Sequence, residues 1–318
     1  ERDPYEAGTG GLNDLRAALA ADGFEVAWWE PGTPPRVPED CAVLAVVDPR
    51  VAYTPEVVEA IQGWVDRGGR LFVAPSRDEA LAATPGGTTQ LVRPFGVEVA
   101  EGVVAQYKPD MRGTFVDGSQ ECAFVFVPTE GLSATHPVTE PLQRIGYNLQ
   151  NVPLARALAR GSAPQGAAVE PLVRAVGQVW LDLPNARGQH DWKHDSARER
   201  PGPFTIVQAC EFPPPALVTV PTPEGGVAER PRARVVVFGA PDALANGALV
   251  HARDLVLNTF NWLAARDWRL NVRPRDPDRR RLDLQSTTAL AAVQRVAFLG
   301  LPGLFALVGV VVAVRRRR

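Results

Sequence analysis

The apolar positions of the first 95 residues alternate between helical spacing and short continuous runs. Leucines three and four residues apart in 12–19 predict a helix that ends at Gly23. A second helix is predicted between the N-cap residue Thr54 and Gly68. The predicted strands are residues 24–29 (FEVAWW), 41–47 (CAVLAVV) and 70–74 (RLFVA). The last two runs are continuously apolar, as in strands of a parallel sheet that is buried on both faces.

The same pattern returns near residue 230, where 234–239 (RVVVFG) predicts a strand and 251–265 a helix. Helices and strands that alternate with short links predict an α/β fold with a doubly wound, mostly parallel sheet. Such a sheet normally starts with a strand. The opening AGTGGLNDL is therefore expected to follow a strand that is missing or that lies within the first few residues.

Residues 96–229 have a different character from the segments that flank them. Short β-type runs such as GVVAQY, CAFVFV, GQVWLDL and FTIVQACEF alternate with proline, glycine and charged residues. This pattern predicts a β-rich insertion or an additional sheet edge. The α/β domain is accordingly predicted to be discontinuous, with residues 1–95 and 230–270 enclosing the insertion.

Residues 296–314 form an unbroken apolar run that four arginines follow. At about 1.5 Å per residue the run spans about 28 Å as a helix, close to the hydrocarbon thickness of a bilayer. A buried helix of a globular domain is the alternative, but such a helix is rarely apolar on every face. We predict a transmembrane helix at 296–314 that follows a charged linker at 271–295. Its anchor residues are Val296, Phe298, Leu301, Leu304, Phe305, Val314, Arg315 and Arg316.

The arginines beside the predicted span indicate its orientation. Residues 315–318 adjoin the span, and the positive-inside rule places such a tail in the cytoplasm. Arginines at 279–281 and 295 nearly balance the count, so proximity decides, and the globular part is predicted to be extracytoplasmic. The chain begins at Glu1 without a methionine, and we expect a signal peptide or a first transmembrane helix upstream.

The composition narrows the classes of function. The 34 basic and 36 acidic residues give a net charge of −2, which does not indicate a nucleic-acid partner. With 45% hydrophobic residues, the chain is expected to fold despite its 30 prolines and 28 glycines. Cys41, Cys122 and Cys210 allow at most one disulfide and form no CxxC metal motif. No cofactor is predicted.

Acidic and hydroxyl side chains follow three of the predicted central strands. Asp48, Ser76 and Asp242 each come shortly after one of the apolar runs. Ligands of a doubly wound sheet bind at this edge, so the three residues are candidate ligand-binding groups in a shared cleft. Loop capping by the aspartates is the alternative. Ser76 suits a helix N-cap better than a nucleophile, because Pro75 stands where a nucleophile elbow requires a small residue.

The segment HDWKHD contains the candidate metal ligands. His190 and His194 are four residues apart, so on a helix they would share one face, with Asp191 or Asp195 as a third ligand. The surrounding sequence lacks apolar periodicity, which favours a solvated loop instead. The glycine-rich opening, EAGTGG, is a weaker candidate for phosphate binding at a helix start, and a plain turn explains it as well.

Two stretches and the C-terminal span together carry a family resemblance. The first includes DLRAALAADGFEVAWWEP, PEDCAVLAVVDPR and YTPEVVEAIQGWVDRGGRLFVAP, and the second RVVVFGAPDALAN and NTFNWLAARDWRLNVRPRDPDRRRLDL. They resemble the GldG-type auxiliary proteins of ABC transport systems, whereas the middle of the chain scarcely does. The resemblance implies a class I glutamine amidotransferase-like or flavodoxin-like domain without the cysteine nucleophile, and this chain contains no GxCxG motif.

The resemblance also implies an extracytoplasmic domain that is anchored in membrane lipid beside an ABC permease and its ATPase. On this basis we expect a non-enzymatic accessory or binding subunit. One alternative is an unrecognised hydrolase that uses Ser76, Asp48 or the His190 and His194 pair. Another is a domain that binds a cell-envelope polymer through the tryptophans at positions 28, 29, 180 and 192.

Overall fold

The structure is a computed structural model that describes residues 2–213, 220–221, 227–228, 232–270 and 315–316. Its helices are α1 (Asn13–Ala21), α2 (Pro55–Asp66), α3 (Glu79–Ala83), α4 (Thr88–Val92), α5 (Glu140–Arg144) and α6 (Arg253–Leu263). Its strands are β1 (Leu44–Val47), β2 (Arg70–Ala74), β3 (Val97–Val99), β4 (Val103–Gln106), β5 (Lys108–Pro109), β6 (Phe115–Val116), β7 (Phe124–Val127), β8 (Leu149–Pro153), β9 (Leu158–Arg160), β10 (Ala168–Ala175), β11 (Val179–Asp182), β12 (Phe204–Phe212), β13 (Val220–Pro221), β14 (Val227–Ala228) and β15 (Ala233–Phe238).

A seven-stranded sheet in the order β1-β2-β15-β12-β9-β3, with β10 also paired to β12, forms the centre of the globular part. β1, β2 and β15 are parallel, whereas every pair from β15–β12 to β9–β3 is antiparallel. The prediction of a mostly parallel sheet is therefore wrong, and the sheet is mixed. The connections give the reason. α2 supplies the crossover between β1 and β2, whereas the β13–β14 hairpin lies between β12 and β15, and antiparallel neighbours need no crossover helix.

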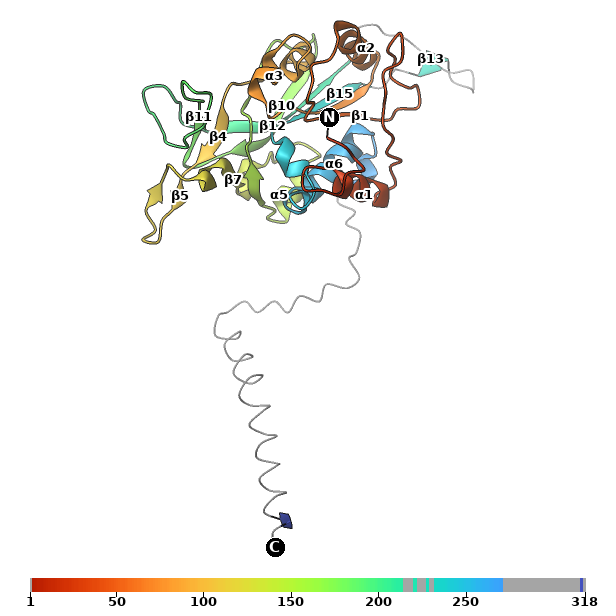
Figure 1. Ribbon diagram of the computed structural model, residues 1–318. Coiled ribbons are helices and arrows are strands. Elements are labelled where there is room, and N and C mark those ends of the chain that lie inside the picture. The colour runs from red at the N-terminus through yellow and green to blue at the C-terminus, as the bar shows by residue number, and fades with distance from the viewer. Residues whose placement is uncertain (1, 214–219, 222–226, 229–231, 271–314, 317–318) are drawn as a thin grey trace. The chain divides into compact units, whose positions relative to one another are not determined.

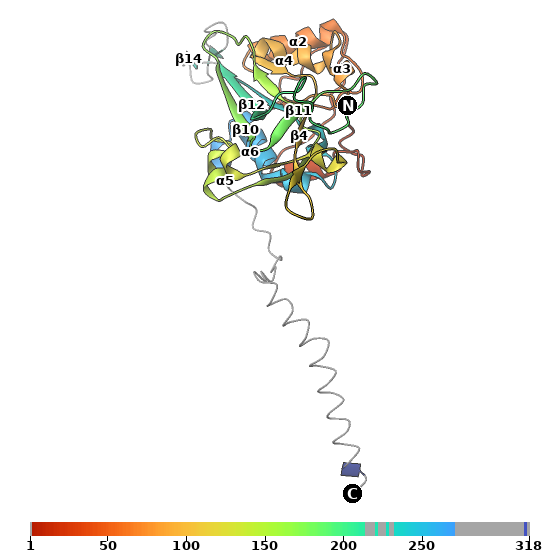
Figure 2. The ribbon, with the colours of Figure 1, turned by 90° about the vertical axis from the view of Figure 1, so that its left-hand side faces the viewer.

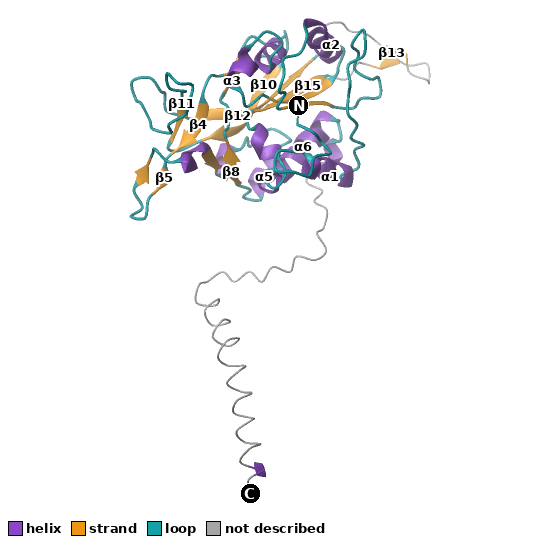
Figure 3. Cartoon of the chain, viewed as in Figure 1, coloured by secondary structure: helices purple, strands orange, loops and turns teal. Residues whose placement is uncertain are grey.

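Helices cover both faces of this sheet (Figures 1 and 3). α1 and α6 pack on one face, where Leu19 and Leu255 share a core with Val47 of β1. α2 and α4 pack on the opposite face, where Ile61 belongs to a second core with Val46 of β1. Neighbouring residues of β1 thus face different cores, because side chains alternate across a strand. This double coverage explains why β1, β2 and β15 are apolar at nearly every position.

Residues 96–229 contribute to the central sheet as well as to smaller sheets. β3, β9, β10 and β12 belong to the seven-stranded sheet, which agrees with the alternative of an additional sheet edge. β4 with β11, β5 with β6 and β7 with β8 form separate antiparallel pairs. β4 and β11 lie at the end of the molecule that Figure 2 turns toward the viewer.

Two predictions about the first half of the chain are corrected. Residues 24–29 form no strand, because no strand in the described part of the chain pairs with them. β1 begins at Leu44 rather than at Cys41. The other helices and strands predicted for residues 1–95 and 230–270 are present, with ends shifted by a few residues.

The predicted membrane anchor stays a prediction. Among the residues that the structure describes, no helix is both long enough and apolar enough to cross a membrane. The predicted span at 296–314 and the linker at 271–295 lie outside the described residues. Of the predicted anchor residues only Arg315 and Arg316 are described, and both are exposed.

Candidate functional site

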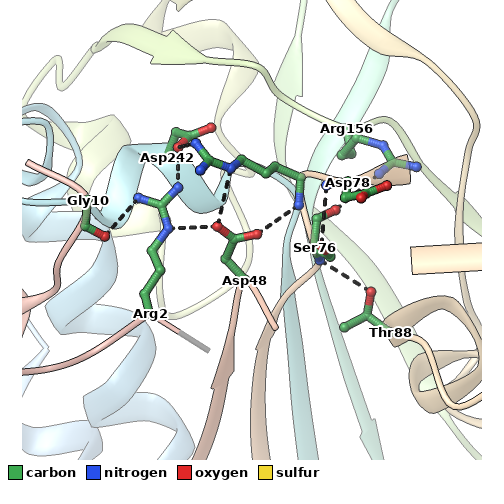
Figure 4. Close-up of polar contacts among 9 residues, drawn as sticks. Arg2, Gly10, Asp48, Ser76, Asp78, Thr88, Arg156 and Asp242 are labelled. Carbon is green, nitrogen blue, oxygen red and sulfur yellow. Dashed lines mark hydrogen bonds and ion pairs between the residues drawn. The ribbon is translucent and has the colours of Figure 1, made fainter. Parts of the chain in front are cut away.

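The three candidate ligand-binding residues lie at the carboxyl ends of the parallel strands. Asp48 follows β1, Ser76 follows β2, and Asp242 lies in a 3-10 helix after β15. Parallel strands end at the same edge of a sheet, so the sheet brings the three loops together (Figure 4). Asp48 and Ser76 are each only 2% exposed, so neither lines an open cleft.

The guanidinium of Arg2 lies between the two aspartates. Its Nε donates a hydrogen bond to Asp48 Oδ2 at 2.8 Å, and its Nη2 donates to Asp242 Oδ1. A further N–H points to the carbonyl of Gly10 at 3.5 Å. The side chains of Arg2 and Asp48 are each 2% exposed and that of Asp242 is 16% exposed. Because an isolated buried carboxylate is costly, Arg2 is the group that stabilises Asp48 in this position.

Arg77 adds a second positive charge at the rim. Its backbone N–H donates to Asp48 Oδ1 at 2.9 Å, and its guanidinium lies 3.7 Å from Asp48 Oδ2 and 3.5 Å from Asp242 Oδ1. We call Arg2, Asp48, Arg77 and Asp242 the edge cluster. Burial alone would lower the pKa of Arg2, but the hydrogen bonds and charges of Asp48 and Asp242 outweigh burial and raise the pKa of Arg2. The guanidinium therefore stays charged and neutralises this edge of the sheet.

Ser76 is held in a turn. Its Oγ accepts a hydrogen bond from the N–H of Asp78 at 3.2 Å, and its own N–H donates to Thr88 Oγ1 at 3.3 Å. Asp78, not Ser76, is the N-cap of α3, because its carboxylate accepts the N–H of Leu81 at 3.1 Å. The predicted capping role of Ser76 is thus displaced by two residues, and Ser76 makes the local turn that precedes the cap.

A second buried arginine supports this turn. Arg156 is 3% exposed, and it donates to the carbonyls of Ser76 at 3.3 Å and of Ala100 at 2.8 Å. Burial lowers the pKa of Arg156. The side chain thereby connects the end of β2 to the segment that leads into β4.

His190 lies between two carboxylates. Its Nδ1 is 2.7 Å from Asp182 Oδ2 at the end of β11, and its Nε2 is 3.3 Å from Glu79 Oε1 at the start of α3. The side chains of Asp182 and Glu79 are 0% and 19% exposed. The hydrogen bond to Asp182 and the contact with Glu79 outweigh burial and raise the pKa of His190 to about 9. His190 is therefore an imidazolium at neutral pH, and we call these three residues the histidine clamp.

The structure separates the two candidate metal-binding histidines. Residues 190–195 form a loop, so the shared helical face is not present. His194 Nδ1 lies 2.8 Å from the hydroxyl of Tyr107, and the His194 N–H donates to Asp117 Oδ2 at 2.9 Å. Within the described ranges, no group of three or more His, Cys, Asp or Glu residues is arranged to hold a metal ion.

The glycine-rich opening is a turn that the rest of the chain holds in place. The N–H of Gly11 donates to the carbonyl of Gly8 at 3.0 Å, and the amide of Asn246 donates to the carbonyls of Glu6 and Gly8 at 2.8 Å and 2.6 Å. A Cβ at Gly11 would lie 2.1 Å from the Glu6 carbonyl oxygen, so only glycine fits. These contacts favour a plain turn over a phosphate site.

Sequence reasoning did not identify Arg2, Glu79 or Asp182. Arg2 contacts residues 46 and 240 positions away, and an arginine near the start of a chain gives no sign of burial. Asp182 did give a signal, because it is the acidic residue inside the apolar run GQVWLDL. Of the tryptophans considered for polymer binding, Trp180 is fully buried and Trp28 is 47% exposed, so the four do not all belong to the surface.

Comparison with known proteins adds a family and a fold. Residues 9–270 match the family model described as "ABC-type uncharacterized transport system". No curated protein matches the chain. Among solved structures, the chain is similar to the mmIFT52 N-terminal domain, with 13% identity and a TM-score of 0.51 over 82% of this chain and 94% of that one. At this identity the similarity concerns the fold alone.

Proposed function

This chain belongs to the auxiliary family of an ABC-type uncharacterized transport system, and we propose that it is a non-enzymatic accessory subunit of a membrane transport complex. The family match is the observation that carries the proposal. The match covers residues 9–270, which is nearly all of the globular part that the structure describes. The assignment therefore applies to the whole α/β fold rather than to one grafted segment.

The edge cluster supports a role without catalysis. Ligands of a doubly wound sheet bind outside the carboxyl ends of its strands. In this chain the buried guanidinium of Arg2 occupies the space between Asp48 and Asp242 at that edge. Ser76 Oγ, the candidate nucleophile, is buried and accepts a backbone hydrogen bond from Asp78. The proposed role of this domain is to bind and position other subunits.

We further propose the membrane arrangement that the sequence predicts. Residues 296–314 would anchor the chain in membrane lipid, residues 315–318 would lie in the cytoplasm, and the globular part would be extracytoplasmic. An ABC permease and its ATPase are the expected partners. Contact with the ATPase would be indirect in this arrangement, because the globular part and an ATPase would lie on opposite sides of the membrane.

Purification of the full chain from its native cells in mild detergent, after crosslinking in the cell, tests the proposal. A permease and an ATPase should co-purify with the chain. Leu304→Arg is the matched variant, because a charge at the centre of a span costs roughly 2.5–3.5 kcal/mol in membrane insertion. That variant should weaken the insertion of this span and reduce the amount of both partners that co-purifies. Purification of the wild-type chain without any transport subunit would overturn the proposal.

The hydrolase alternative has its own test. Ser76→Ala, Asp48→Asn and His190→Gln remove its candidate groups one at a time. Under our proposal, none of these substitutions changes labelling by serine-hydrolase probes, because the wild-type chain is not labelled. Labelling of the wild-type chain that Ser76→Ala abolishes would refute the non-enzymatic assignment.

A further inference from the structure

A groove of about 470 Å³ lies beside β1, the edge strand of the central sheet. Its walls are residues 41–47, which include β1, and residues 24–29, the segment that was expected to be a strand. Leu15 and Leu19 of α1 and Phe260 of α6 also line it. The groove is therefore apolar on the side of these helices, and on another side it has the backbone of an edge strand.

β1 presents unused backbone groups to this groove. The N–H of Asp48 donates to the carbonyl of Ala74, the last residue of β2. Backbone groups of alternate residues in a strand point to the same side, so those of Val46 and Leu44 also point toward β2. The N–H and C=O groups of Val43, Ala45 and Val47 consequently turn outward, toward the groove. Of these groups, the carbonyl of Val47 accepts the N–H of Arg2 at 3.3 Å, and the N–H of Val43 faces the thiol of Cys41. Within the described part of the chain, the backbone groups of Ala45 and the N–H of Val47 have no hydrogen-bond partner across the groove.

Among the described residues, the opposite wall pairs with no strand either. Phe24 and Val26 are half-buried and contact the α1 side of the core, whereas Glu25 and Ala27 are exposed. This alternation is that of a strand. From residue 25 to residue 29, however, the described contacts include no backbone–backbone hydrogen bond. Two strand-like segments thus face one groove, and neither pairs across it with a strand that the structure describes.

The helices show what kind of strand fits between these walls. α1 packs on one face of the sheet and α2 on the opposite face. A right-handed crossover through α2 joins β1 to β2. That connection leads from β1 toward the centre of the sheet. A strand in the groove would connect through α1 to residues 24–29, which lie on the side away from the centre. Because the two connections lead in opposite directions across the sheet, both are right-handed only if α1 and α2 lie on opposite faces. The observed faces satisfy this rule for a strand that precedes α1 and is parallel to β1.

We propose that this groove is a strand-acceptor site, which takes one parallel β-strand from polypeptide that runs into Glu1. The bond from the Arg2 N–H to the Val47 carbonyl is then the last of its ladder bonds, at the carboxyl end of β1. The accepted strand would have apolar side chains on both faces, because each neighbouring strand in this part of the sheet does. It would extend the parallel part of the sheet beyond β1 and remove the open edge.

Amide hydrogen exchange of the chain with short N-terminal extensions tests the proposal. An extension of strand-forming residues, Val-Ile-Val-Thr-Val, is joined directly before Glu1, and Gly-Ser-Gly-Ser-Gly is joined there as the matched control. We expect exchange at Ala45 and Val47 to slow by at least about tenfold with the first extension only. Unchanged exchange with the strand-forming extension would overturn the proposal.

A substitution in β1 and an unlinked peptide complete the test. Ala45→Pro removes an N–H that faces the groove and not β2, a position that tolerates proline on an edge strand. In the extended chain it should abolish the slower exchange at Val47, whereas Ala45→Val, which keeps the N–H, should preserve it. Equal protection by the free peptide Val-Ile-Val-Thr-Val would assign the groove to a separate partner and would overturn the covalent source.

Discussion

The edge cluster and the histidine clamp have the same arrangement with different cations. The cation is Arg2 in the edge cluster and His190 in the histidine clamp. Each lies between one deeply buried carboxylate, Asp48 or Asp182, and one carboxylate that is closer to the surface. The side chains of the buried pair are 2% and 0% exposed, and those of the other pair are 16% and 19% exposed. In both clusters the enclosed cation offsets the desolvation free energy of the buried carboxylate.

The choice of cation makes the two clusters respond differently to pH. A guanidinium does not lose its proton in a protein, and the pKa of Arg2 is raised further. An imidazolium does titrate, here with a pKa of about 9. At alkaline pH the ion pairs of Arg2 therefore persist, whereas His190 loses its proton and with it the charge that attracts Asp182 and Glu79. Arg2 fixes the start of the chain to the sheet, whereas His190 fixes the loop after β11 to α3.

The largest effect should come from removing the buried carboxylate of the edge cluster. Asp48→Ala leaves the Arg2 guanidinium buried with only Asp242 as a charged partner, and we expect a loss of about 3–5 kcal/mol in the free energy of unfolding. Chemical denaturation measures it. Asp242→Ala is the matched control and should cost less, because Asp242 is partly exposed and Arg2 keeps Asp48. Equal losses for the two variants would contradict this account.

The next largest effect should be the loss, at alkaline pH, of the unfolding free energy that the histidine clamp contributes. The folded-state pKa of His190 is about 9, above its usual value of 6.5. The stabilisation is therefore complete below the unfolded-state pKa and is lost as pH rises through about 9. A shift of this size corresponds to roughly 3 kcal/mol of unfolding free energy.

Denaturation of the wild type and of His190→Gln at about pH 6 and about pH 10 measures this loss. The difference between the two proteins isolates His190 from other groups that titrate in the same range. It should shrink by roughly 3 kcal/mol from the lower to the higher pH. A difference that does not change with pH would show that His190 is not the titrating group.

Substitution of Glu79, the less buried carboxylate of the clamp, should have a smaller effect. Glu79→Gln keeps a hydrogen-bond acceptor for His190 but removes one negative charge, so the pKa of His190 should fall toward its usual value. The expected destabilisation near neutral pH is about 1–2 kcal/mol, in the range of a hydrogen bond to a charged group. Titration of His190 by NMR measures the pKa directly. An unchanged pKa would mean that Asp182 alone holds the imidazolium.

The parallel part of the fold was predictable from the sequence because each strand there is apolar on both faces. Residues 70–74 and 234–239 stand out for this reason, and both are strands of the sheet. Residues 204–212 are also mostly apolar, but a single sequence does not indicate that β12 lies beside β15 with the opposite direction. Residues 24–29 also have strand-like alternation, yet a strand requires a partner, and pairing is a property of the whole fold.

The site was predictable only in part, for a similar reason. The positions of Asp48, Ser76 and Asp242 after apolar runs placed them correctly at one edge of the sheet. The arrangement of Asp48 and Asp242 there depends on Arg2, which no local pattern connects to them, because the contact spans 240 residues to Asp242. His190 was singled out for its spacing to His194, whereas its actual partners come from α3 and β11.

The smallest effect should come from substituting Arg77, the exposed cation of the edge cluster. Arg77 contacts the same two aspartates as Arg2, but its side chain is 51% exposed and its ion pairs measure 3.7 Å and 3.5 Å. Exposed pairs of this kind contribute about 0–1 kcal/mol, so Arg77→Ala should change the free energy of unfolding by less than about 1 kcal/mol. The backbone N–H of residue 77 still donates to Asp48 in this variant, and Arg2 still pairs with both carboxylates. Added salt should abolish the small effect, because screening acts on exposed pairs. A loss as large as that of Asp48→Ala would instead mean that both arginines are required to neutralise the buried carboxylate.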